Sequence, residues 1–178
     1  MIRMFTGRTV LFHLFLLLLF FCPGCSSEPD TLFSEPIQAC SLFTHDEIET
    51  FFGTKVDNPP RETHKVDEQN GSWMSMCNYF APETNQSSGI LIRPIAKGRS
   101  VDQVYDEYVA ELKASLPDYE LGTISGVGTK ATWDGQTGQL TVFEGTYMLL
   151  ISVMQPTKSE EEKLAFCKQI AEAVLKKL

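Results

Sequence analysis

The sequence predicts a single α+β domain, with a mostly antiparallel sheet packed by three helices, after a signal peptide and a short tether. Three observations predict this fold class. Apolar residues recur at helical spacing in three separate stretches, and short strand-like segments lie between them. Turn residues join most of these segments directly, so neighbouring strands can pair antiparallel without a long crossover. The length of 178 residues is that of one domain, whose helices must pack on the sheet to bury their apolar sides.

Each expected helix begins at a capping box, in which a hydroxyl residue and a Glu or Gln three positions later satisfy each other's backbone amides. The three boxes are Thr44 with Glu47, Ser100 with Gln103, and Ser159 with Glu162. The helices that follow are expected at residues 44–52, 100–116 and 159–178. Gly53 ends the first helix and Pro117 ends the second.

The clearest strand covers residues 72–80, where side chains point alternately to the two faces. One face carries Trp73, Ser75, Cys77 and Tyr79, and the other carries Met74, Met76, Asn78 and Phe80. Further strands are expected at residues 55–56, 89–95, 119–124, 130–133, 139–143 and 147–154. The last of these is apolar on both faces, which predicts a central position. Residues 61–72 are polar and lead to the turn signal Asn70-Gly71, and no strand is assigned to them.

The first 24 residues have the layout of a secretory signal peptide. Arg3 and Arg8 form a positive region, and residues 10–21 form an apolar run that His13 interrupts. About 12 residues with a rise of about 1.5 Å each cannot span a hydrocarbon core of roughly 30 Å. A permanent transmembrane helix is therefore disfavoured.

The segment Cys22-Pro23-Gly24-Cys25 resembles the lipobox of bacterial lipoproteins. In that motif the signal peptide is cut before a cysteine that then receives lipid, so the resemblance implies that Cys25 is acylated. The family usually has an aliphatic residue where Cys22 stands, and an ordinary signal peptide cut nearby is the alternative. Lipidation implies a membrane-anchored protein of the cell envelope that faces the periplasm or the cell exterior.

Residues 25–38 are rich in Ser, Pro and acidic residues and are expected to form a flexible tether before the domain at 39–178. The whole chain has a net charge of −8. An acidic domain repels nucleic acid and anionic lipid headgroups, so nucleic acid is not expected as a partner. Membrane attachment is expected to depend on the lipid on Cys25 rather than on a basic surface.

Cys40, Cys77 and Cys167 remain once the signal peptide is removed and Cys25 is acylated. In an oxidising compartment they permit one disulfide and one remaining thiol. We expect Cys40 to pair with Cys77, and the alternative is that Cys167 pairs with one of these two. Because Cys167 lies in the apolar stripe of the last helix, it is expected to be a buried, inert thiol.

Three short motifs resemble lipoprotein domains of unknown function that occur widely in actinobacteria and in some other bacteria. They are Ala39-Cys40-Ser41-Leu42-Phe43-Thr44, Cys77-Asn78-Tyr79 and Gly126-Val127-Gly128-Thr129-Lys130-Ala131-Thr132-Trp133. That family has a Cys-x-Leu-Leu-Thr start, a Cys-Thr-Trp or Cys-Thr-Tyr strand and a Gly-Leu-Gly-Asp-x-Ala-Tyr segment. The resemblance covers about residues 39–178. It implies the Cys40–Cys77 disulfide and an architecture similar to PsbP-like α/β/α sandwiches, and it implies no catalytic residues.

Two segments invite a ligand-binding interpretation. The glycines at 126 and 128 precede Lys130, but their spacing differs from that of a phosphate loop and a strand follows them, so a turn is favoured. Met74, Met76 and Cys77, together with His64, offer the ligand types of a soft-metal site. The methionines alternate away from Cys77 on the strand, so core packing is favoured and no metal is expected.

His45 and the acidic residues of the second expected helix are interpreted as surface residues rather than as catalytic or metal-binding groups. His45 lies in the first turn of a helix, without a nucleophile motif nearby, and is interpreted as a solvated surface residue. The second expected helix carries a cluster of acids without the spacing of a calcium loop, which indicates a solvated acidic face. Its members are Asp102, Asp106, Glu107 and Glu111.

Trp73, Tyr79 and Trp133 are the candidate lining of a hydrophobic pocket between sheet and helix, although aromatic residues on strands usually pack in the core. The anchor, the tether and the lack of a catalytic motif favour a non-catalytic envelope protein. We expect it to dock a protein partner or to support an envelope assembly. Binding of a small molecule or lipid in the aromatic pocket is the alternative, no cofactor is expected, and an enzyme is disfavoured.

Overall fold

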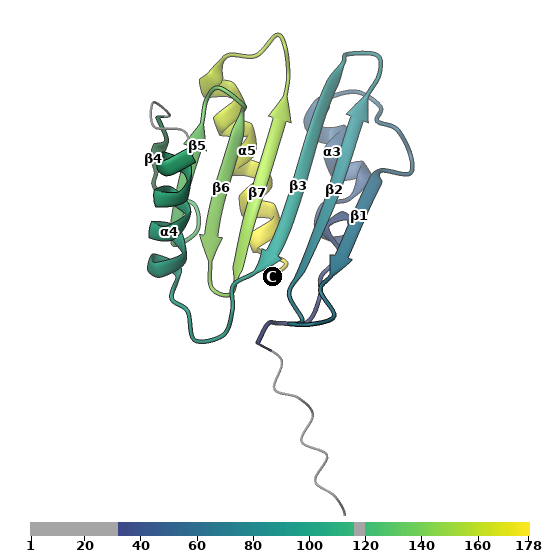
Figure 1. Cartoon of the computed structure of the whole chain (residues 1–178). Helices are drawn as coiled ribbons and strands as arrows, with labels where there is room; N and C mark the ends of the chain where they lie inside the picture. The colour runs from purple at the N-terminus through teal and green to yellow at the C-terminus, as the bar shows by residue number, and fades with distance from the viewer. Residues whose placement is uncertain (1–31, 116–119) are drawn as a thin grey trace, which may run out of the picture. The chain divides into compact units, whose positions relative to one another are not determined.

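The computed structural model describes residues 32–115 and 120–178 (Figure 1). These residues form one seven-stranded antiparallel sheet and four helices, which confirms the predicted α+β fold class. The predicted signal peptide at 1–24, Cys25 and the beginning of the tether lie outside the described residues. Thr31–Leu178 forms a compact unit whose buried apolar residues run from Ala39 to Val174, so this unit has a complete core without the residues before it.

The sheet is built from two groups of consecutive strands. In chain order the strands are β1 (Arg61–Val66), β2 (Trp73–Ala81), β3 (Gln86–Pro94), β4 (Gly122–Ile124), β5 (Lys130–Asp134), β6 (Gln139–Glu144) and β7 (Tyr147–Met154). Their order across the sheet is β1-β2-β3-β7-β6-β5-β4. After β3 the chain crosses to the far edge and returns strand by strand, so the apolar strand β7 lies in the centre as predicted.

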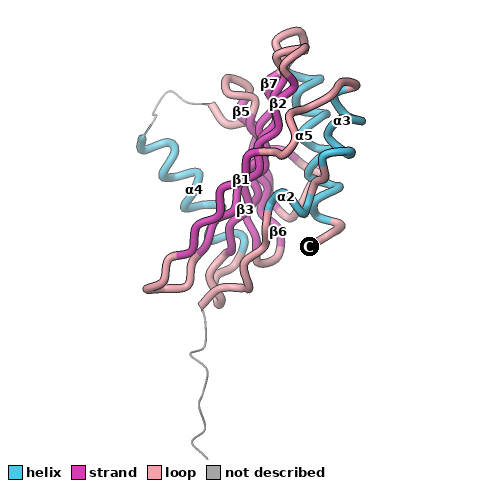
Figure 2. Tube along the Cα trace, turned by 90° about the vertical axis from the view of Figure 1, so that its right-hand side faces the viewer, coloured by secondary structure: helices cyan, strands magenta, loops and turns pink. Residues whose placement is uncertain are grey.

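The helices divide between the two faces of the sheet. They are α2 (Ala39–Leu42), α3 (His45–Phe52), α4 (Val101–Ser115) and α5 (Glu160–Leu175). Figure 2 shows α2, α3 and α5 on one face and α4 on the other. The hydrogen bonds of all three predicted capping boxes are present. The short helix α2 was not predicted from the sequence.

The main core lies between the sheet and α5. Alternate positions of the central strands point to this side, and Ile90, Leu140 and Ile151 are fully buried there. Cys167, Ile170 and Val174 of α5 pack against them, and all three are fully buried. The Phe166 ring of α5 lies with its centroid 5.1 Å from that of Phe51 and 5.7 Å from that of Phe52, which joins α5 to α3. We name this side of the sheet the α5 side.

A smaller core lies under α4 on the opposite side. The rings of Tyr105 and Tyr108 meet the ring of Phe143 at centroid distances of 5.6 and 5.5 Å, and Met148 packs beside them. The Tyr108 hydroxyl and Thr141 Oγ1 are 3.1 Å apart, within hydrogen-bonding distance. These contacts place α4 over β5 and β6. Figure 1 shows that the same side of β1, β2 and β3 has no helix over it.

The edge strand β1 differs from the sequence expectation. Residues 61–66 are polar and were not predicted to form a strand, yet all six pair with β2. A strand at an edge whose residues are mostly exposed needs few apolar side chains, and charged residues there discourage pairing with another chain. The strand expected at 55–56 is absent, and the Val56 amide instead donates to Glu49 Oε1 at 3.1 Å.

Candidate functional site

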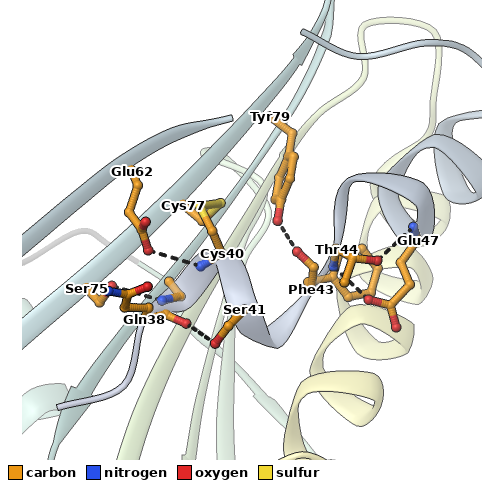
Figure 3. Close-up of a disulfide and its surroundings, with 11 residues drawn as sticks. Gln38, Cys40, Ser41, Phe43, Thr44, Glu47, Glu62, Ser75, Cys77 and Tyr79 are labelled. Atoms are coloured by element: carbon orange, nitrogen blue, oxygen red, sulfur yellow. Dashed lines mark hydrogen bonds between the residues drawn. A yellow bond between two sulfur atoms is a disulfide. The ribbon is translucent and has the colours of Figure 1, made fainter. Parts of the chain in front are cut away.

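A disulfide ties the start of the domain to the sheet (Figure 3). Cys40 of α2 and Cys77 of β2 are bonded, with Cα atoms 5.0 Å apart, which confirms the predicted pair. The Ala39 amide donates to Ser75 Oγ at 2.9 Å, and the Tyr79 hydroxyl donates to the Phe43 carbonyl. This corner therefore holds α2 and the beginning of α3 on the α5 side of β2.

The three predicted pocket residues lie in the core on the α5 side, with 4%, 1% and 5% of Trp73, Tyr79 and Trp133 exposed. Their polar atoms are all bonded. Trp73 Nε1 donates to the Ser34 carbonyl at 2.7 Å, and Trp133 Nε1 donates to Glu160 Oε1 at 2.9 Å. Trp73 also lines a groove at one end of the sheet, while Tyr79 lines a different hollow. The structure therefore does not gather the three around one cavity.

The proposed soft-metal ligands are also separated. Cys77 is in the disulfide, and Met74 and Met76 point to the side of the sheet opposite Cys77. His64 pairs with Ser75 on the α5 side, where its ring lies 6.4 Å from that of Trp73. No single ion can contact these four side chains, so the structure agrees with the packing interpretation.

His45 is more enclosed than its sequence position suggested, with 24% of the side chain exposed. Its two ring nitrogens face different carboxylates: Nδ1 lies 3.4 Å from Asp46 Oδ1 and Nε2 lies 3.5 Å from Glu49 Oε1. The ligand atoms of these three residues lie within 4.8 Å of one another. However, the Glu49 carboxylate already accepts from Lys55 Nζ and the Val56 amide. The cluster therefore fastens residues 55–56 to α3.

Cys167 is a free thiol in the main core and is fully buried. Burial raises its pKa to about 12, because the thiolate would lose its hydration. Its Sγ lies 3.8 Å from the Ile151 carbonyl oxygen, which fits a protonated thiol.

We expect Cys167 in the folded unit at residues 31–178 to resist an aromatic disulfide reagent at pH 8, and to react fully after denaturation. The reactive thiolate is disfavoured and the reagent cannot reach it in the core. A Lys176→Cys variant places a thiol at an exposed position after α5 and serves as the control, which should react within minutes. Native labelling of Cys167 at the rate of that control would contradict the buried assignment.

The largest uncovered part of the sheet lies beside α4. The side chains of β2, β3 and β7 that point to this side and are partly or largely exposed include Met76, Asn78, Phe80, Leu91, Leu150 and Met154. We call this set the open face. Met154 has 57% of its surface exposed. Gly89 lies at its centre, where an added Cβ would come within 2.8 Å of Asn78 Oδ1 and Ser152 Oγ.

The charges on this side have one sign. Positions of β1, β2, β3 and β7 that point away from α5 include Arg61, Lys65 and Arg93, and they include no Asp or Glu. The acidic cluster predicted for the second helix lies on that helix, α4, where Asp102 pairs with Lys130 and Glu107 pairs with Arg99. The net charge of −8 therefore does not describe this part of the surface.

A groove of about 480 Å³ lies at the end of the open face, where Phe33 near the start of the described chain lines it. Its floor includes Met74, Ile95, Val104 and Met148, and its rim includes Lys65, Arg93 and Arg99. We call these seven residues the basic groove. No motif in the sequence predicts it, because its residues come from four strands, a loop and a helix.

Comparison with models of protein families, with curated proteins and with solved structures finds no match to this chain. In the residues that the structure describes, no helix is both long enough and apolar enough to cross a membrane.

Proposed function

We propose that this chain is an exported, non-catalytic protein of the cell envelope, anchored by lipid on Cys25, which docks a partner protein on the open face. The docking proposal rests on the half of the sheet that no helix covers on the side opposite α5. Contiguous apolar side chains that a protein leaves exposed mark contact sites more often than chance. The helix on this side, α4, lies mainly over β5 and β6 and reaches β7 only near Met148 in the described residues.

The apolar side chains and the positive charge of the open face indicate what kind of partner it binds. Its apolar centre consists of methionine, leucine and phenylalanine side chains, and Met side chains adapt to irregular partner surfaces. Arg61 lies beside Asn78 at its edge, and the strands carry no carboxylate on this side. The partner is therefore a protein whose contact surface is apolar and bordered by Asp or Glu. A second copy fits poorly, because two such faces would bring cations against cations.

The anchor explains how the domain stays near that partner. The segment Gly24-Cys25 supplies the acylation signal, and residues 26–31 with the start of the described chain supply the reach. A tethered domain meets other envelope proteins at a raised effective concentration, so a modest contact surface suffices for docking.

Met154→Glu is expected to reduce docking at least tenfold, because a carboxylate would be buried against an apolar and acidic partner surface. Met154 is largely exposed in the free domain, so folding stability should change by less than about 0.5 kcal/mol. Val66→Glu is the matched control, because Val66 is 48% exposed and points to the α5 side.

The measurement is native mass spectrometry of the full chain released from membranes in mild detergent. The proposal expects a complex with a different protein for the wild type and for Val66→Glu, and its loss for Met154→Glu. A self-associated dimer, no complex at all, or equal loss in both variants would contradict docking on the open face.

A further inference from the structure

The basic groove combines cations with an apolar floor in a regular row. Lys65 pairs with Met74, Ser75 pairs with Ile92 so that Met74 adjoins Arg93, and Arg93 pairs with Met148. Cation and thioether thus alternate across four strands on one side of the sheet. The Arg93 Nε donates to Met148 Sδ at 3.0 Å, which lays its guanidinium along the floor. Such a groove suits a ligand with an anionic head and an apolar body.

Two of the cations are available for such a ligand. Among the described residues no carboxylate pairs with Lys65 or Arg93, whereas Arg99 already pairs with Glu107. Asp67 also lines the groove, but its oxygens accept from the Gln69 amide at 2.8 Å and from Asn70 Nδ2 at 2.9 Å. The Asp67 carboxylate is therefore held by the β1–β2 turn and forms no ion pair with Lys65 or Arg93, so the groove keeps an excess of positive charge.

The groove lies where the chain comes from the proposed anchor. Phe33 lines it, and the Leu32 carbonyl accepts from the Lys97 amide at 2.7 Å just beyond β3. Six residues lie between Cys25 and Leu32, and a fully extended chain over that sequence separation of seven spans at most roughly 25 Å. An acylated Cys25 would therefore hold this end of the sheet close to the membrane surface. The described chain enters at the same end of the sheet as the β1–β2 turn (Figure 1).

We propose that the basic groove binds the phosphate of an anionic phospholipid, with Lys65 and Arg93 at the phosphate and with Met74 and Met148 against the apolar part of the lipid. Its placement opposite the bilayer rests on the proposed anchor, whereas binding itself depends only on the groove. This contact would orient the domain with its tether end toward the membrane and leave the open face accessible to the partner protein.

The test uses the unit at residues 31–178, which has its own core and lacks the anchor. We expect it to co-sediment with vesicles containing 30% phosphatidylglycerol in phosphatidylcholine, and much less with phosphatidylcholine alone. Each cation near an anionic surface contributes about fivefold to binding, so Lys65→Gln and Arg93→Gln should each weaken it by about that factor and the double variant by about 25-fold. Lys176→Gln removes an exposed cation next to α5 and should change nothing.

Several results would overturn the lipid proposal. Two of them are the absence of binding to anionic vesicles and equal effects of Lys176→Gln and Arg93→Gln. The third is that inorganic phosphate saturates the site with the same affinity as vesicles, which would identify a soluble anion as the ligand. Met154→Glu lies outside the groove and should leave vesicle binding unchanged. Failure of protein docking and failure of lipid binding are thus measured by different variants.

Discussion

Replacing both Cys40 and Cys77 by alanine is expected to lower the free energy of unfolding by about 4 kcal/mol. The disulfide closes a loop with a sequence separation of 37, and opening it returns conformational entropy to the unfolded chain. The bond also fastens α2 to β2 at the corner where Ala39 donates to Ser75. Native domains are only marginally stable, so this loss of unfolding free energy would leave the variant partly unfolded at the growth temperature of the cell.

Chemical denaturation of the unit at residues 31–178 under oxidising conditions measures this effect. Cys167→Ala is the control, since it removes a buried thiol without removing a cross-link, and its loss of stability should be much smaller. If the double variant lost less than about 1 kcal/mol, the disulfide would not be the main constraint on the amino-terminal corner.

Cys25→Ser is expected to move nearly all of the protein from the membrane fraction to the soluble fraction. A single acyl chain gives only marginal membrane binding and two or more give durable attachment, so loss of the acylation site removes the dominant attachment. The described residues contain no helix that could replace it. In the described residues, Lys65 and Arg93 of the basic groove have no carboxylate partner and would add a weaker attachment to the membrane. Salt suppresses this attachment because it screens exposed charges.

Fractionation should therefore be done in about 0.5 M salt, where the Debye length is only a few ångströms and the groove contributes little. Serine at position 26 offers a neighbouring control, because Ser26→Ala leaves the cysteine in place and should stay with the membrane. Retention of Cys25→Ser in the membrane fraction at high salt would contradict lipid anchoring at this residue.

The sequence predicted correctly those elements that depend on residues close together in the chain. The capping boxes at Thr44, Ser100 and Ser159 each form, because a hydroxyl and a Glu or Gln three positions apart meet in the first turn of any helix. The alternation in residues 72–80 placed Cys77 on one face and Met76 on the other for the same reason. Strand β7 is central, as its apolar residues on both faces predicted, although Leu150 and Met154 on the side opposite α5 stay partly or largely exposed.

Features that depend on tertiary placement could not be predicted in the same way. The spacing of apolar residues in α4 shows which side of the helix is buried, but not which face of the sheet receives it. The open face exists because α4 lies mainly over β5 and β6 and leaves most of this side of β2, β3 and β7 uncovered. Strand β1 was missed because an edge strand with solvent beside it tolerates polar residues throughout.

The candidate site was missed for a related reason. Lys65, Arg93 and Arg99 come together only through the register of β1, β2 and β3 and the turn into α4, so no short motif contains them. Net charge averages over the whole surface and led to the expectation that the domain has no basic surface. The charges on the uncovered side of the sheet correct that expectation.

The most direct test of the central claim is site-specific photo-crosslinking in living cells, with the photoreactive residue at Leu150 on the open face or at Glu172 on the outer side of α5. We expect Leu150 to form a discrete adduct with a different protein, whose crosslinked peptide contains apolar and acidic residues, and Glu172 to form none. Adducts of equal yield from both positions, or an adduct only with a second copy of the chain, would contradict the account.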